Sequence, residues 1–518
     1  MTRLVGNFRE WLSANKNNKL ILVLCIIFVV KGIFYAAYVT PLTMFTAPDD
    51  TGHFSYIQYL ASQRRLPIHG QTGFEESTLH AHHMYGRYGE VIDFEIGEES
   101  FDTSVTDEIN WIVQHPPLYY IAMAVLYSIA SFFTRQFSTM ILILRIANLA
   151  FGVASLIVMH KILNLLKAKD IVRTCILFFF VFSAPMQYFF STITNDSMLI
   201  FMCIFALYYL FKYMDTNRLK HFVIFVIGSA LIFGTKYNGF MVMFVYIGFF
   251  IYYSLRYNGL KETAKLGLIG VPIGLAIILP DLLFNHFTSG RLLSNEGGVV
   301  RGTVTFAGTH DRTFPRFLFR THYLDFITRH IILKLGWDLH GWIRPDLFVE
   351  RTFALFSVAI TAIHFIKSKN KLIASPVLLI GGIVFVYYRF ILPTPEYTVA
   401  ISMIIACMLM LLCFTIMRAI KSDSLDSKER EIHWLFIAAL IATLLVYMYT
   451  HFGMYQRRGV IMATHGRYYY IAFFPFAYML FHQLGELKSK LTKYIPLALL
   501  VVLTLIEYRA VSLALQQW

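Results

Sequence analysis

Apolar runs long enough to cross a lipid bilayer recur along this chain, and they limit its fold more than any other feature. A membrane-spanning helix needs about 20 predominantly apolar residues, and the run from Leu20 to Tyr38 reaches that length. Apolar residues make up 57% of the 518 residues, whereas soluble domains contain about 45–50%. The sequence therefore predicts an all-α polytopic membrane protein.

The apolar runs predict thirteen membrane-spanning helices. The first covers 20–38, and the other twelve cover approximately 138–163, 172–191, 197–213, 220–235, 238–255, 265–285, 348–366, 374–392, 396–418, 433–450, 467–485 and 494–513. A further run, 118–133, is predicted to be an interfacial or re-entrant helix on the outer face. If it crossed the membrane, the basic patch around Lys167 would be exported, against the positive-inside bias.

The distribution of charge predicts how the chain is oriented. Arg3, Arg9, Lys16 and Lys19 precede the first span, so we expect a cytoplasmic N-terminus and no cleaved signal peptide. Residues 39–115 then carry twelve acidic and three basic side chains, a net charge of −9 on the outer side. The overall charge of +14 is therefore attributed to basic cytoplasmic loops, and no nucleic-acid partner is expected.

Two long outer segments divide the chain. We expect an N-terminal transmembrane module at 1–285 that includes a catalytic outer loop at 39–137, a second outer loop at 286–347, and a C-terminal transmembrane module at 348–518. Both loops contain helical patterns that predict helices on the membrane surface. No separate soluble domain is expected, and Gly297-Gly298 lacks the strand and helix of a phosphate-cradling loop. A phosphate substrate would therefore be carried by a lipid.

The sharpest polar motif is PDDTGHF at 48–54, directly after the first span. In a helix that begins near Asp49, the carboxylates of Asp49 and Asp50 lie three or four positions before His53, so all three side chains are expected to converge. Two adjacent like charges disfavour ionisation of both groups, which favours a general base. The alternative is an aspartate that caps the helix N-terminus.

Further polar candidates lie where outer segments meet the spans. His115 precedes two prolines at the entry to the 118–133 helix, and Asn195-Asp196 follows the third crossing on the outer side. An acid there could face Asp49 across a cavity. The alternative for each motif is a simple turn or cap.

Together with Arg145, Thr235-Lys236-Tyr237 and His465-Gly466-Arg467-Tyr468, these motifs resemble the GT-C superfamily of membrane glycosyltransferases. They are most similar to bacterial members related to protein O-mannosyltransferases and aminoarabinose transferases. The motifs extend from position 48 to 468, so the resemblance covers nearly the whole chain. It implies a GT-C-like fold in the bacterial inner membrane and an extracytoplasmic active site.

The resemblance also implies the reaction and the partners. The donor would be a sugar, hexose or pentose, on a polyprenyl phosphate such as undecaprenyl phosphate, transferred with inversion at its anomeric carbon. Because no long soluble domain is available to dock a large polymer, we expect the acceptor to be a hydroxyl of an envelope or lipid-linked glycan. The family's first-loop acid maps onto Asp49, with Asp50 in the second place and His53 beside them. The second outer acidic motif offers only Asp196, so no metal or other cofactor is expected, although a divalent cation is an alternative.

Cations are needed where the phosphodiester departs. The outer candidates are Lys236, Arg312, Arg316, Arg320, Arg457, Arg458 and Arg467. We assign donor-phosphate or substrate contacts to Lys236, Arg320, Arg457 and Arg467, together with His115, Asn195, Asp196 and Tyr468. Arginine can grip a phosphate with two parallel hydrogen bonds. The alternative is that some arginines balance the acidic first loop or touch anionic headgroups.

Two other kinds of protein fit the same pattern of apolar runs. A transporter or flippase of lipid-linked sugars would need charged residues along a pathway near the membrane midplane, and such proteins commonly contain paired repeats. The candidate residues instead cluster near the outer boundary, and no repeat is visible. A scaffold subunit with a degenerate site is disfavoured because the acid, histidine and arginine positions are all filled.

Overall fold

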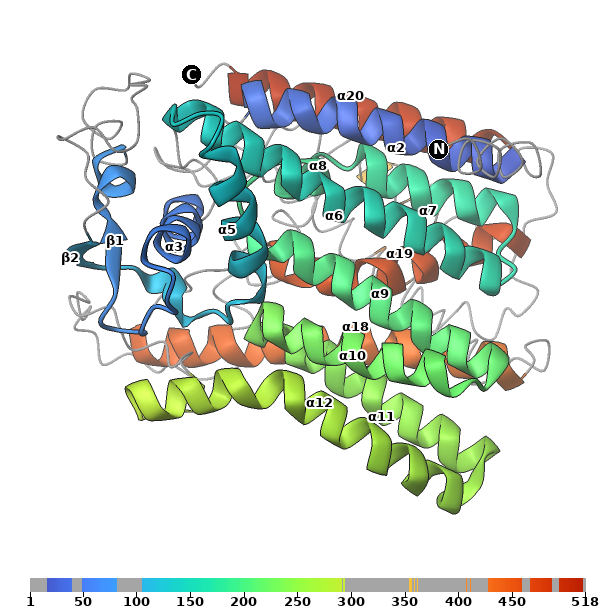
Figure 1. Ribbon diagram of the computed structural model, residues 1–518. Helices are drawn as coiled ribbons and strands as arrows, with labels where there is room; N and C mark the ends of the chain where they lie inside the picture. The colour runs from blue at the N-terminus through green and yellow to red at the C-terminus, as the bar shows by residue number, and fades with distance from the viewer. Residues whose placement is uncertain are drawn as a thin grey trace, which may run out of the picture.

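The computed structural model describes residues 16–39, 49–81, 105–290, 292–293, 427–458, 466–486 and 493–515, with single positions between 354 and 410. Long helices run side by side as one bundle, and short helices and two strands from residues 50–130 lie at one end of it (Figure 1). The longer helices are α2 (Lys16–Phe34), α6 (Phe137–Leu165), α9 (Asn195–Thr216), α10 (Leu219–Thr235), α11 (Phe240–Tyr257), α12 (Gly259–Ser289), α18 (Ser427–Arg458) and α20 (Ile495–Leu515). This arrangement confirms the predicted all-α membrane fold.

Shorter elements connect the long helices. They are the π-helix η1 (Tyr35–Val39), α3 (Asp50–Gln63), β1 (Gly73–Glu75), β2 (Val105–Ile109), η3 (Trp111–Gln114), α5 (Leu118–Ala130), α7 (Asp170–Phe182), α8 (Ala184–Phe190), η4 (Tyr237–Gly239), η6 (Gly466–Ala472), α19 (Phe473–His482) and η7 (Gln483–Glu486). The antiparallel pair β1–β2, with Gly73 opposite Ile109, is a small addition that the all-helical expectation did not include.

Six helices of the described residues are long and apolar enough to cross a membrane, or seven if the bent pair α7 and α8 is one span. The six confirm the expected spans at 20–38, 138–163, 197–213, 238–255, 265–285 and 433–450. The expected spans at 348–366, 374–392 and 396–418 lie outside the described residues, so the total of thirteen stays a prediction.

The expected span at 467–485 is not one regular helix. The 3-10 turn η6 precedes α19, which has only ten residues, and η7 follows it. Pro475 lies in the first turn of α19, the one part of a helix where the missing N–H of proline is tolerated. The proline therefore favours a helix that starts at Phe473 rather than one that runs continuously from 467.

Pro185 explains the break between α7 and α8. Proline lacks a backbone N–H, and its ring clashes with the carbonyl four residues earlier, which here belongs to Val181. The two helices meet at an angle of 59°. Lys31 of α2 donates to the Val181 carbonyl at 3.0 Å and pairs with Glu507 of α20 at 2.6 Å. The partly buried Lys31 thus satisfies the carbonyl that the proline leaves without a helical partner.

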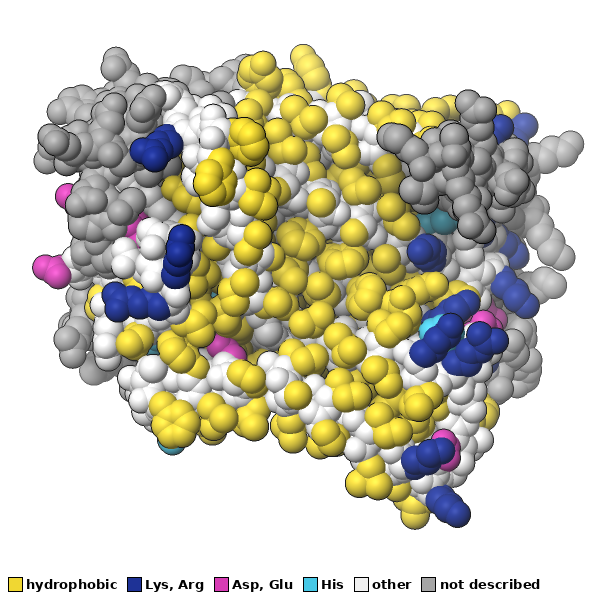
Figure 2. Space-filling view, viewed as in Figure 1, with side chains coloured by type: hydrophobic (Ala, Val, Ile, Leu, Met, Phe, Trp, Pro, Cys, Tyr) yellow, Lys and Arg dark blue, Asp and Glu magenta, His cyan; other side chains and the backbone are white. Residues whose placement is uncertain are grey.

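Basic side chains gather at one end of the bundle, which we call the basic end. They lie in the turns between α6 and α7, α9 and α10, and α11 and α12, and Figure 2 shows Lys and Arg side chains there beside an apolar surface. Lys169 donates to the Gly485 carbonyl at 2.6 Å, and Arg256 pairs with Glu431 at 3.4 Å. The start of α18 and the turn η7 that follows α19 therefore lie at the same end.

The first outer loop folds at the opposite end, which we call the loop end. Figure 1 shows α3, α5 and the β1–β2 pair there, with α5 lying across the ends of the long helices rather than along them. Thirteen residues of α5 make a helix of about 20 Å, shorter than the apolar core of about 30 Å. This position agrees with the predicted non-crossing helix.

Helices from both expected transmembrane modules share one core. C-terminal α20 packs against α7, and α18 packs against α11. Helix α12 continues to Ser289, four residues past the expected module boundary at 285. The rest of the expected second outer loop, and its helical pattern around 317–331, lies outside the described residues apart from 290, 292 and 293.

We predict that Lys31→Met destabilises the protein by about 3–5 kcal/mol, because it leaves the Glu507 carboxylate buried without its counter-charge. The measurement is the thermal unfolding midpoint of the purified protein in detergent. The matched control is Lys31→Met/Glu507→Leu, which removes both charges and should recover most of the loss. A single variant no less stable than the double variant would contradict this role for the pair.

Candidate functional site

Asp49 precedes α3 but does not cap it. Its backbone is in the left-handed region, with φ 67° and ψ 9°, and its side chain makes no capping hydrogen bond. The Trp111 indole N–H instead donates to Asp49 Oδ1 at 3.2 Å. The alternative that Asp49 is merely a helix cap is therefore not supported, and its carboxylate is held toward η3.

The start of α3 is docked on η3 by close packing. Asn110 Nδ2 donates to the Gly52 carbonyl at 3.0 Å, and Asn110 Oδ1 accepts the Ile112 N–H at 2.9 Å. A Cβ at Gly52 would collide with the Ile112 side chain. Glycine at position 52 thus allows the approach that brings Asp49 to Trp111.

Asp50 lies in a different environment from Asp49. Its Oδ2 accepts from Arg145 Nη2 at 3.1 Å, and both side chains are fully buried. Its Oδ1 accepts the backbone N–H of Ile193 at 2.9 Å. The Arg145 guanidinium on α6 is thus a charge partner of Asp50, and the expected convergence of both aspartates on the His53 imidazole stays a prediction.

His53 belongs to an aromatic cluster at the loop end. Its Nδ1 shares a hydrogen bond of 2.8 Å with the Tyr120 hydroxyl. The Tyr120 ring stacks on Tyr56 with centroids 3.9 Å apart, and the His53 and His115 rings are nearly parallel with centroids 6.3 Å apart. The packing of α3 against η3 and α5 thus brings together the two histidines that the sequence separates by about sixty positions.

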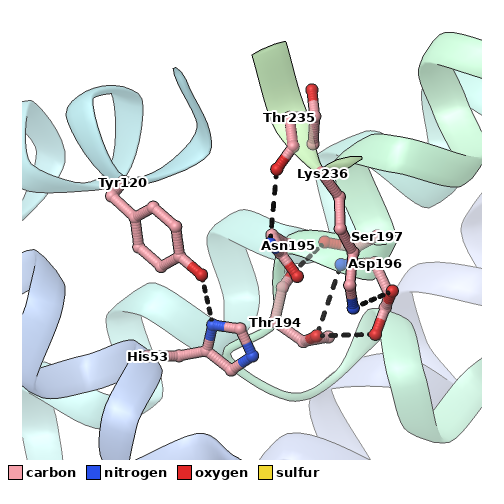
Figure 3. Close-up of polar contacts among 8 residues, drawn as sticks. All are labelled: His53, Tyr120, Thr194, Asn195, Asp196, Ser197, Thr235 and Lys236. Carbon is pink, nitrogen blue, oxygen red and sulfur yellow. Dashed lines mark hydrogen bonds and ion pairs between the residues drawn. The ribbon is translucent and has the colours of Figure 1, made fainter. Parts of the chain in front are cut away.

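The second part of the site is the N-terminus of α9. Lys236 Nζ lies 2.7 Å from Asp196 Oδ1, and both side chains are almost completely buried. Thr194 caps the helix by accepting the Asp196 N–H at 3.3 Å, and Asn195 Nδ2 donates to the Thr235 carbonyl at 3.3 Å. In Figure 3, His53 with Tyr120 and Asp196 with Lys236 lie on either side of Thr194.

Tyr468 lies against Lys236, although the two are more than two hundred positions apart in the sequence. Lys236 Nζ lies over the Tyr468 ring, 5.3 Å from its centroid. The Tyr447 ring also stacks on the Tyr468 ring, with centroids 5.3 Å apart. The cation–π contact joins η6 to the α10–α11 turn. The two motifs therefore meet, as the sequence-based assignment of Lys236 and Tyr468 to one site requires.

His115 connects the two parts electrostatically. Burial lowers the pKa of His115 well below its usual 6.5, and nearby Lys236 and His53 lower it further, while Asp196 and Asp49 oppose the shift. All four groups are thus close enough to act on one imidazole. His115 is neutral at pH 7, so it can offer one donor and one acceptor but no charge.

Two buried polar atoms of the site have no hydrogen-bond partner among the described residues. They are Nδ1 of His115 and Oδ1 of Asn195. Leaving a buried polar atom unpaired costs about 1–3 kcal/mol. Such atoms could instead bind a polar ligand or water.

Several predicted residues cannot be placed. Arg312, Arg316 and Arg320 lie outside the described residues, and only the backbone is described at Arg457 and Arg458 in α18 and at Arg467 in η6. Their assigned phosphate contacts remain predictions. Within the described residues, no group of three or more His, Cys, Asp and Glu side chains could hold a metal ion.

Sequence reasoning missed Trp111 and Tyr120 as members of the site and named Arg145 without a partner. Trp111 is 43% exposed, so its position in a polar outer loop was the only available signal. Tyr120 lies three residues after the second of the two prolines and belongs to the same motif as His115. Its hydrogen bond depends on how α5 packs on α3, which no local pattern specifies.

No protein-family model matches the sequence, and neither does any curated protein. Among solved structures, the chain is similar to the crystal structure of ArnT from Cupriavidus metallidurans bound to undecaprenyl phosphate. The identity is 11% and the TM-score is 0.36, over 89% of this chain and 77% of that one. A likeness at this level assigns no role to residues of this chain.

We predict that acid destabilises the protein partly through His115. As the pH falls through about 6.5, His115 takes up a proton in the unfolded state but not in the folded state, whose pKa is lowered. Stability present above that pH is therefore lost below it, by at most about 1.4 kcal/mol per pH unit. The measurement compares unfolding midpoints of wild type and His115→Gln at about pH 7.5 and about pH 5.5. The variant should lose less on acidification; equal losses would contradict the prediction.

Proposed function

We propose that this protein is an inverting glycosyltransferase of the GT-C type. It would move a sugar from a polyprenyl-phosphate donor to a hydroxyl of an envelope or lipid-linked glycan on the extracytoplasmic face of the bacterial inner membrane. The observation that carries the proposal is the Asp49 carboxylate. It does not cap α3, and Trp111 holds it near His115. We infer that this carboxylate is the general base that accepts the proton of the incoming hydroxyl.

The proposed reaction needs little chemistry from the protein. Asp49 accepts the proton of the acceptor hydroxyl while the acceptor oxygen bonds to the anomeric carbon. The bond between that carbon and the phosphate oxygen breaks on the opposite face, and its electron pair leaves with the polyprenyl phosphate. Attack opposite to the leaving group inverts the anomeric centre, as in other inverting transfers.

The departing phosphate needs hydrogen-bond donors. An ammonium group has three N–H donors, and Lys236 directs one of them to Asp196 at 2.7 Å. We propose that Lys236 also contacts the donor phosphate. Because Asp196 balances its charge, Lys236 alone gives the site no net positive charge, so the proposal includes a second cation, Arg467.

Transport is the alternative, and one intramembrane charge pair is relevant to it. Lys31 and Glu507 lie within helices of the bundle but bind each other, and the Tyr35 hydroxyl donates to Glu507 at 3.1 Å. A closed pair of this kind is better suited to joining helices than to passing a substrate. Purified protein given radiolabelled polyprenyl-phosphate sugar separates the two functions. Transfer or hydrolysis supports the enzyme, whereas movement across liposomes without chemistry supports the transporter.

We predict that Asp49→Asn lowers the transfer rate at least about a hundredfold, because general-base catalysis is worth about that much. Asparagine tolerates the left-handed backbone that Asp49 adopts, so the variant should fold and bind donor nearly as wild type does. The measurement is the initial rate of sugar transfer by purified protein. A variant that keeps more than about a tenth of the wild-type rate would remove Asp49 as the base.

Asp50→Asn is the matched control for that prediction. It neutralises the neighbouring carboxylate and leaves Arg145 buried without its counter-charge, so it should lower the unfolding midpoint. Its transfer rate per folded molecule should fall less than that of Asp49→Asn. Equal rate losses in the two variants would instead indicate that the aspartates share a proton or a metal.

We predict that transfer activity survives EDTA. Asp196, the single acid of the second outer motif, is already bound to the Lys236 ammonium, and a positive group in that place competes with a divalent cation. The measurement compares rates of transfer with and without chelator. Loss of activity that Mg²⁺ or Mn²⁺ restores would recast Asp49 as a metal ligand.

A further inference from the structure

Asp281 is an acidic residue in an otherwise apolar part of α12, which is long enough to cross a membrane. Its side chain is partly exposed, and the proposed reaction does not use it. Ionisable groups within membrane helices are costly and usually have a specific role. The question is what this carboxylate binds.

Two neighbours orient Asp281. The Tyr237 hydroxyl donates to Asp281 Oδ2 at 2.7 Å, and Asn285 Nδ2, one turn further along α12, donates to the Tyr237 oxygen at 2.7 Å. Tyr237 and Asn285 are 3% and 8% exposed. The chain of hydrogen bonds therefore fixes one carboxylate oxygen, and a carboxylate has about four acceptor positions in total.

This cluster lies beside the proposed active site. Tyr237 directly follows Lys236 in the chain. Burial raises the pKa of Tyr56 well above 10, and the nearby Asp281 and Tyr237 raise it further. In Figure 1, α12 ends at the loop end of the bundle, where α3 and α5 lie.

The chemistry of a carboxylate selects its ligand. A negative group repels a phosphate, so Asp281 is unsuited to the phosphate of the donor. It accepts hydrogen bonds and therefore suits a ligand with several hydroxyls close to that phosphate. We propose that Asp281, positioned by Tyr237 and Asn285, binds hydroxyl groups of a sugar ring and helps to determine sugar specificity. This assignment rests on the proposed transferase function, and the sugar belongs to either the donor or the acceptor.

The test compares two lipid probes on full-length protein in detergent, undecaprenyl phosphate and undecaprenyl phosphoglucose, with undecaprenyl phosphogalactose as a second sugar. Asp281→Asn keeps the shape of the side chain and removes its charge. If the donor sugar is the ligand, the variant should bind at least one of the sugar-bearing lipids about ten- to a hundredfold more weakly. Its affinity for bare undecaprenyl phosphate should stay within about twofold of wild type.

A second arm covers an acceptor sugar. Affinity for both sugar-bearing lipids and the rate of donor hydrolysis then stay unchanged, while the KM for a membrane glycan extract at saturating donor rises about tenfold or more. Tyr237→Phe serves if Asp281→Asn does not fold. It keeps the carboxylate but removes its alignment, so the same sugar-dependent quantity should change by about three- to tenfold.

Glu262→Gln is the matched control, an acid-to-amide change at the other end of α12, where the side chain is 45% exposed. It should leave every quantity unchanged. The assignment is overturned if folded Asp281→Asn or Tyr237→Phe matches wild type in both sugar binding and acceptor KM, which would make the cluster a link between α12 and η4. Failure of wild type itself to bind any of the lipids or to transfer sugar would instead overturn the proposed function.

Discussion

The buried ion pair of Asp50 and Arg145 is the interaction on which the loop end depends. It joins the start of α3 to α6, and its partners reach further: Arg145 Nη1 donates to the Ala36 carbonyl in η1 at 3.2 Å, and Asp50 accepts the Ile193 N–H ahead of α9. Four segments that are distant in sequence are thus bound to one pair of charges. Breaking a buried pair costs more than its formation gains, because the remaining charge is left uncompensated. The relative position of the first loop and α9 follows from that constraint.

The pair also places two adjacent acids in different surroundings. Asp50 has lost contact with solvent and has a guanidinium beside it, whereas Asp49 remains partly exposed with an indole N–H on one oxygen. Asp196 and Lys236 form a second buried pair a short distance away. Both pairs are internally balanced, so the two adjacent aspartates differ in burial and in their electrostatic surroundings.

Apolar runs and basic turns allowed the bundle to be predicted from the sequence. A helix in a membrane makes all its backbone hydrogen bonds internally, so its length and hydropathy identify it. The helix after Asp49 was also predictable. The break at Pro185 was missed because a proline in an apolar run is compatible with a continuous span. The pairing of Asp50 with Arg145 depends on how helices rotate against each other, which no local pattern records. Asp281 was visible as one acid within an expected span, yet only the structure places Tyr237 and Asn285 around it.

The backbone at Asp49 has a consequence for which acid can stand there. Aspartate and glutamate have similar intrinsic acidity, so acid–base chemistry alone hardly distinguishes them. The backbone φ of 67° at this position does distinguish them. Residues other than glycine, asparagine and aspartate are destabilised by roughly 1–2 kcal/mol in the left-handed region. A longer side chain would also carry its carboxylate past the Trp111 indole. The turn into α3 therefore selects the shorter acid, and it does so for reasons of backbone conformation as much as for reactivity.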